Sequence, residues 1–215
     1  MKGGHEWKPG PGAKPKFTGT MTGTLLETVG KAAVTCVSGE FNGEWAGAKT
    51  ASVELILKGC TNSASKPCQT SVLTAGEVKT EEAIEGHLGF IRKAVRAKAP
   101  WVGFDLTPKE GKTSILKFTC GGPPEEVSLG ESWTVSGSVI GRIKPITRMH
   151  STEQLLYDAA SGKQSVEKFA EGVKDTLLVA RSEGLEKHEE QASLAASTTT
   201  FEIHYEEEAE IKAKV

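Results

Sequence analysis

The stretch Ala33–Phe41, AVTCVSGEF, decides the fold together with three later segments of the same kind. Each segment is rich in residues that favour β-strands, and each contains or borders a cysteine. The three later segments are SVELILKGC (52–60), CQTSVLTAG (68–76) and ILKFTC (115–120). We therefore expect them to be strands of one sheet system that is locked by disulfides.

The chain has four cysteines, and no CxxC pair suggests a zinc or redox site. Three disulfide pairings are possible. The polar, proline-containing loop TNSASKP separates Cys60 from Cys68 and favours a local bridge between them, which leaves Cys36 to pair with Cys120. Disulfides are typical of secreted proteins, so the sequence predicts an extracellular location. Four reduced, buried cysteines in a cytosolic protein are the alternative.

Further strand patterns extend the sheet on both sides of this region. Trp133–Ile143 is a long one, in which Gly137 and Gly141 interrupt the apolar face. Ala33–Trp45 places Val37, Phe41 and Trp45 on one face with Gly39 and Gly43, which indicates a bulge or a closely packed neighbour. About a dozen such strands predict an all-β fold, an antiparallel barrel or sandwich with at most one or two short helices.

The two ends of the chain differ in composition. Residues 1–20 are rich in Lys, Pro and Gly, which predicts a flexible tail, either a linker or a basic arm for an anionic surface. Residues 21–215 then form a single β domain. The first residues lack the apolar region of a signal peptide, so export would require that a signal has been removed. No apolar run approaches 18 residues, so no transmembrane segment is expected.

Charge and motifs exclude several function classes. The formal net charge is −2, so no basic field is available to hold nucleic acid. The sequence has no HExxH, GxSxG or phosphate-loop pattern, so we expect no catalytic residue, metal or cofactor. A pair of carboxylates on strands remains open as a glycosidase site. The candidates are Glu40, Glu44, Glu54, Glu85 and Asp105.

Three tryptophans at strand ends are the most suggestive candidates for binding. If exposed in a row, Trp45, Trp101 and Trp133 would stack on sugar rings. Because their neighbours on the strands are apolar, we favour the alternative that they fill the core.

Several stretches resemble a family of uncharacterised secreted β-rich proteins of soil actinobacteria. The resemblance lies in 30–36, ILKFTCGG (115–122), 136–143 and GKQSVEKFAEGVKDTLL (162–178). It implies export and a β-rich domain, and no catalytic residue.

Our leading hypothesis is a non-enzymatic, secreted or cell-surface structural or binding protein. Its partner would be a second copy of the chain or a cell-surface polysaccharide, and strand 193–205 is a possible pairing edge. A carbohydrate-binding module or glycoside-cleaving enzyme that uses the tryptophans is the alternative.

Overall fold

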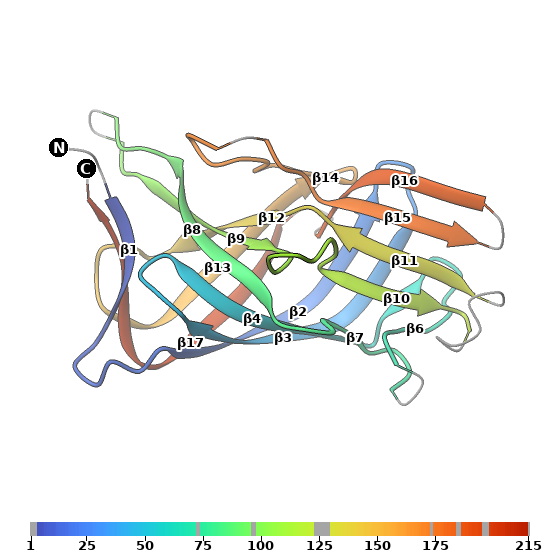
Figure 1. Cartoon of the computed structure of the whole chain (residues 1–215), viewed down its shortest axis with the longest axis horizontal. Helices are drawn as coiled ribbons and strands as arrows, with labels where there is room; N and C mark the ends of the chain where they lie inside the picture. The colour runs from blue at the N-terminus through green and yellow to red at the C-terminus, as the bar shows by residue number, and fades with distance from the viewer. Residues whose placement is uncertain are drawn as a thin grey trace.

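The computed structural model describes residues 4–71, 74–95, 98–122, 130–172, 174–183, 186–194 and 198–214. It is all-β: 65% of the chain is strand, and the described residues form no helix. The molecule is elongated, with both termini at one end (Figure 1). The predicted fold class is therefore confirmed, and the architecture is a barrel.

The core of the fold is an antiparallel barrel of eight strands. Each barrel strand pairs with the next one along the chain, and the last closes the ring by pairing with the first. In order, the strands are β2 (Lys16–Thr28), β3 (Ala33–Trp45), β4 (Thr50–Lys58), β8 (Ile84–Arg92), β9 (Trp101–Thr107), β12 (Val139–Lys144), β13 (His150–Ala160) and β17 (Thr198–Lys214).

Aromatic rings fill the barrel. Phe17 lies between Phe41, Trp45 and Phe104, with ring centroids 5.5 to 6.5 Å away. The glycines on the apolar faces make room for these rings. For Gly43, the structure shows the closely packed neighbour that was one of the two alternatives. A Cβ atom at Gly43 would lie 2.2 Å from the ring of Phe17. An eight-stranded barrel is just wide enough for side chains to fill, and here they fill it.

Further strands extend the barrel at the end opposite the termini (Figure 1). They form a second ring with the far ends of β2 and β3, through an unbroken series of pairings. The bridge between Thr61 and Pro67 closes the series. The added strands of this second ring are β5 (Thr61–Asn62), β6 (Cys68–Gln69), β10 (Leu116–Cys120), β11 (Glu131–Ser136), β15 (Leu178–Glu183) and β16 (Glu186–Ser193).

Two strands change their buried face where the barrel meets the second ring. In β3 the buried positions are even up to Cys36 and odd from Gly39 onward, and Val37 between them is 73% exposed. Our placement of Val37 on the buried face is therefore wrong. The neighbouring strand β2 changes face at Gly23, whose φ is 73°. Gly137, with a φ of 81°, similarly divides the predicted strand 133–143 into β11 and β12.

The N-terminal residues belong to the fold. β1 (Gly4–Pro9) pairs with the last part of β17, and β2 begins at Lys16. Trp7 stacks on Trp45 with 5.6 Å between the ring centroids, so β1 covers the end of the barrel. The prediction of a flexible tail over residues 1–20 is wrong for these strands. The partner of β1 lies about 200 residues away in the chain and leaves no local signal, whereas β2 pairs with the neighbouring strand β3.

The last strand is not a free edge. Residues 202–204 of β17 pair with β13 on one side and with β2 on the other, so this part of the predicted pairing edge at 193–205 is not open; residues 195–197 lie outside the described part. Two short strands, β7 (Val78–Lys79) and β14 (Lys163–Gln164), pair with β4 and β13. One continuous cluster of buried apolar residues runs through both the barrel and the second ring.

Candidate functional site

The three tryptophans do not form an exposed row. Trp45 is 5% exposed inside the barrel, and Trp133 is 1% exposed inside the second ring, where it stacks on Phe118. Both are core residues, as the preferred interpretation predicted. Trp101 begins β9 and stays partly exposed on the outer surface of the barrel. Sugar stacking on all three tryptophans together is therefore not available to this fold.

The disulfides pair differently from our prediction: Cys36 bonds to Cys60, and Cys68 bonds to Cys120. Cys60 and Cys68 do flank a hairpin, but there they meet through the backbone, with the Cys68 N–H donating to the Cys60 carbonyl at 2.9 Å. Their side chains point away from each other instead: Cys60 faces β3 and Cys68 faces β10. Chain proximity alone therefore led to the wrong pairing.

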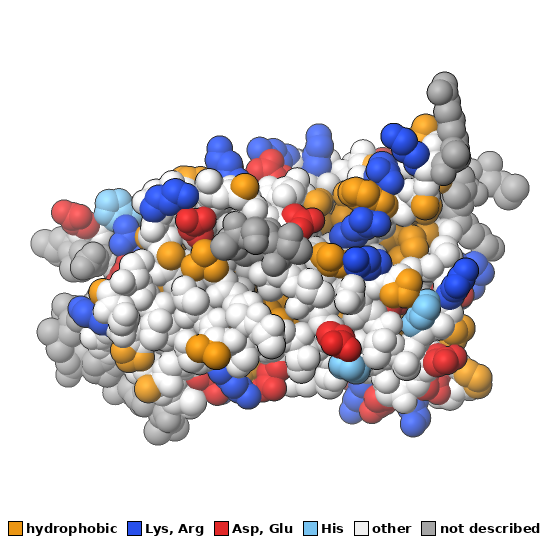
Figure 2. Space-filling model, turned by 180° about the vertical axis from the view of Figure 1, so that it is seen from behind, with side chains coloured by type: hydrophobic (Ala, Val, Ile, Leu, Met, Phe, Trp, Pro, Cys, Tyr) orange, Lys and Arg blue, Asp and Glu red, His pale blue; other side chains and the backbone are white. Residues whose placement is uncertain are grey.

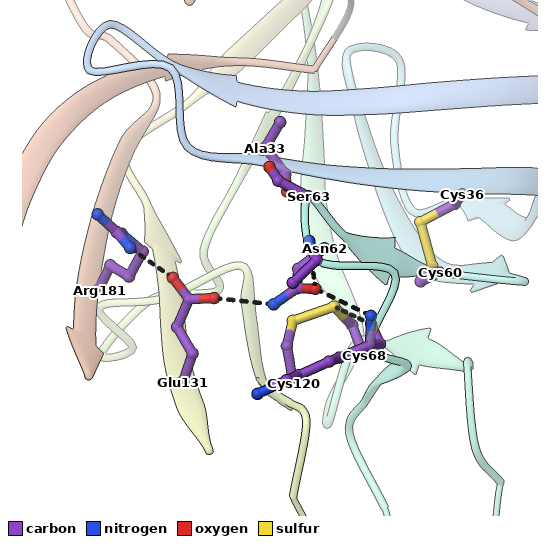
Figure 3. Close-up of a disulfide and its surroundings, with 11 residues drawn as sticks. Ala33, Cys36, Cys60, Asn62, Ser63, Cys68, Cys120, Glu131 and Arg181 are labelled. Atoms are coloured by element: carbon purple, nitrogen blue, oxygen red, sulfur yellow. Dashed lines mark hydrogen bonds and ion pairs between the residues drawn. A yellow bond between two sulfur atoms is a disulfide. The ribbon is translucent and has the colours of Figure 1, made fainter. Parts of the chain in front are cut away.

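The two disulfides thus link neighbouring segments of the second ring at one level: Cys36–Cys60 on one side and Cys68–Cys120 on the other. The two disulfides flank the two-residue strands β5 and β6, where the second ring closes (Figure 3). We call this place the seam. Because β5 and β6 have only two residues each, few backbone hydrogen bonds hold the seam together. The two disulfides therefore fix a closure that strand pairing alone would hold weakly.

A polar groove of about 350 Å³ opens beside the seam. Its walls are the β2–β3 turn at residues 30–33 and the loop at residues 62–64. Glu131, Trp133 and Arg181 complete the lining. Glu131 and Trp133 come from β11, and Arg181 comes from the paired strand β15, directly opposite Trp133. The groove therefore places charged side chains over the buried stack of Trp133.

The charged side chains of the groove hold one another in place (Figure 3). Arg181 donates through Nη1 to Glu131 Oε1 at 2.6 Å. Asn62 donates through Nδ2 to the other Glu131 oxygen at 3.3 Å, so both carboxylate oxygens are bound. The Asn62 side-chain oxygen in turn accepts the N–H groups of Ala64 and Lys66, which fixes the loop.

The arrangement leaves binding capacity unused. A guanidinium carries five N–H donors; Arg181 uses Nη1 on Glu131, and its Nε, which is buried from solvent, has no hydrogen-bond partner among the described residues. The Arg181 side chain is 21% exposed and the Glu131 side chain 12% exposed, so water reaches both only in part. A ligand in the groove would reach the terminal nitrogens of Arg181 rather than the buried Nε, and such nitrogens suit hydroxyl or carboxylate oxygens.

The carboxylates considered for glycoside cleavage lie elsewhere, on strands of the barrel. Asp105 on β9 lies directly opposite His87 on β8, and His87 Nε2 is 3.2 Å from Glu85 Oε2. Burial, together with the charge of Asp175, raises the pKa of Asp105 to about 7. Glu40, Glu44 and Glu54 lie on β3 and β4. Among the described residues no three His, Cys, Asp or Glu side chains gather as a metal site.

Sequence reasoning missed the residues of the groove. Glu131, Asn62 and Arg181 are far apart in the chain, and each is an ordinary surface type when read alone. The turn-forming loop TNSASKP was the one signal that pointed to the Asn62 region.

Comparisons of the chain with protein-family models, curated protein sequences and solved structures find no match. Within the described residues, no helix has the length and apolar character needed to cross a membrane. The two disulfides are consistent with a secreted protein. The resemblance to secreted actinobacterial proteins stays a prediction.

Proposed function

We propose that this chain is an exported, non-enzymatic binding protein, and that the groove beside the seam takes a polar unit of a cell-surface carbohydrate. The observation that carries the proposal is the Arg181–Glu131–Asn62 network, which holds a partly exposed guanidinium in a fixed orientation in the groove. Sugar hydroxyls bind well to planar, pre-positioned side chains of these three types, because such groups offer paired donors and acceptors in fixed directions.

Two further features support this function. Both disulfides lie next to the groove, so covalent bonds fix the walls that would bind the ligand. Preorganisation of this kind favours affinity because little conformational entropy is lost on binding. Export fits the same feature, since structural disulfides persist in oxidising compartments.

Binding should be measured by calorimetry against a panel of neutral, amino and acidic cell-wall oligosaccharides. For the best ligand, we expect Arg181→Met to weaken binding about tenfold or more, because a charged hydrogen bond is lost. Arg148→Met is the matched control, since Arg148 is an exposed arginine outside the groove. The thermal transition of each variant shows whether the fold is retained.

Two results would contradict the proposal. One is unchanged affinity in a folded Arg181→Met variant, which would place the ligand elsewhere. The other is release of shorter sugars during long incubation, detected by chromatography, which would make the protein an enzyme and direct attention to Asp105.

A further inference from the structure

Trp101 lies between two arginines on the outer surface of the barrel. The Arg92 guanidinium carbon is 4.1 Å from the centroid of the Trp101 ring, and that of Arg142 is 3.9 Å away. Arg92 comes from β8 and Arg142 from β12, the strands on either side of β9. Both contacts are within the range of cation–π attraction, so the indole holds two positive groups close together.

The two positive charges are incompletely balanced. Burial lowers the pKa of Arg142, the nearby charge of Arg92 lowers it further, and the opposing effect of Asp158 is smaller. Arg92 donates through one Nη to the Ala99 carbonyl at 3.1 Å, and its Nε is buried from solvent. An anion bound beside the ring would relieve the repulsion between the two guanidinium groups.

The surroundings of this cluster are partly apolar. Leu156 lies opposite Arg142 in the pairing of β12 with β13 and is partly exposed. More generally, the face turned away from the view of Figure 1 shows hydrophobic side chains bordered by Lys and Arg (Figure 2). With Leu156 beside two guanidinium groups, the cluster suits a ligand that combines apolar faces with negative groups.

We propose that Arg92, Trp101 and Arg142 form a second binding site, separate from the groove, for the carboxylate groups of an acidic polysaccharide. Guanidinium groups bind carboxylates through two parallel hydrogen bonds, and sugar rings present apolar faces to the bordering side chains. Nucleic acid fits less well. Two arginines neutralise only about two phosphates, and the formal net charge of the chain is −2.

The test uses polygalacturonate as the probe and dextran, a neutral glucan, as its control, with calorimetry at 0.05 M and at about 0.15 M salt, where the Debye length is near 8 Å. We expect binding of polygalacturonate only. The double variant Arg92→Gln/Arg142→Gln should bind at least about tenfold more weakly. The double variant Lys66→Gln/Lys109→Gln removes the same charge from exposed positions elsewhere and should bind normally.

A third variant separates the guanidinium geometry from charge alone. Arg92→Lys/Arg142→Lys keeps both charges but loses the planar, two-pronged donors, so its affinity should also fall. Thermal transitions equal to that of the parent protein confirm that each variant is folded.

Several outcomes would contradict the proposal of this site. They are normal binding by the folded glutamine variant, equal loss in the lysine control pair, and full affinity of the Arg→Lys variant. Tighter binding of anionic lipid vesicles or of single-stranded DNA than of polygalacturonate also overturns it. Arg181→Met should leave polygalacturonate binding unchanged, so failure here is distinguishable from failure of the groove proposal.

Discussion

The barrel and the second ring are held together by different means. The barrel is closed by long strands and packed with aromatic rings, such as Phe17 against Phe41 and Phe104. The second ring closes through the two-residue strands β5 and β6, and both disulfides flank that closure. Where strand pairing is short, covalent bonds take its place, and this is also where the proposed groove opens.

The largest expected effect comes from removing the disulfides. Each bond closes a loop in the unfolded chain, across sequence separations of 24 and 52 residues. The chain-entropy relation gives about 3 to 4 kcal/mol of unfolding free energy for each. In the variant in which all four cysteines are alanine, we expect the second ring to open while the barrel persists, seen as hydrogen exchange that becomes fast in β10 and β11 but stays slow in β3 and β4.

Cooperative loss of protection in both regions would contradict this comparison, because it would show that the barrel depends on the seam. The single-bridge variants Cys36→Ala/Cys60→Ala and Cys68→Ala/Cys120→Ala serve as controls. Comparing each with the four-alanine variant shows whether the two bonds act independently.

The sequence predicted what depends on local pattern. Alternation and turn residues gave the all-β class, and the glycines on apolar faces indicated the close approach that Gly43 makes to Phe17. The tail prediction failed because β1 is recruited by β17 from the far end of the chain. Val37 was misplaced because the buried face changes there, at the level of Gly23 on β2.

The candidate sites were less predictable than the fold. The disulfide pairing was wrong because Cys60 and Cys68 are neighbours in the chain but direct their side chains to different strands. Glu131 and Arg181 meet across two strands that lie 50 residues apart, and a single sequence carries no sign of that pairing. Of the three tryptophans, Trp45 and Trp133 are buried and only Trp101 is partly exposed.

We expect pH to have an intermediate effect on the unfolding free energy, through a carboxyl group inside the barrel. Glu153 lies inside the barrel, 1% exposed, and accepts a hydrogen bond from the Tyr205 hydroxyl at 2.7 Å. Burial raises the pKa of Glu153 to about 8. Between its ordinary pKa of 4.5 and about 8, the unfolded chain loses this proton while the folded chain keeps it. Stability should therefore be greatest below that window and fall as pH rises through it.

Denaturant titrations from pH 4 to pH 9 test this, with Glu153→Gln as the neutral counterpart. The buried carboxyl of Asp105 acts in the same direction, so the informative quantity is the difference between the parent protein and the variant. We expect the variant to gain relative stability steadily from pH 5 to pH 8. A difference that does not change with pH would mean that Glu153 is ionised in the folded barrel.

We expect the smallest change in unfolding free energy from removing one buried hydroxyl in each region. Tyr157 in the barrel and Thr119 in the second ring are buried, and neither hydroxyl has a hydrogen-bond partner among the described residues. A buried hydroxyl without a partner has lost its water, so Tyr157→Phe and Thr119→Val should each raise the unfolding free energy by about 1 kcal/mol. Thr119→Val replaces the hydroxyl with a methyl group of similar size, whereas Tyr157→Phe leaves a small gap in the aromatic packing. The gain should therefore be smaller in the barrel, and denaturant midpoints at constant slope measure it. A loss of stability at either position would mean that the hydroxyl binds an internal water.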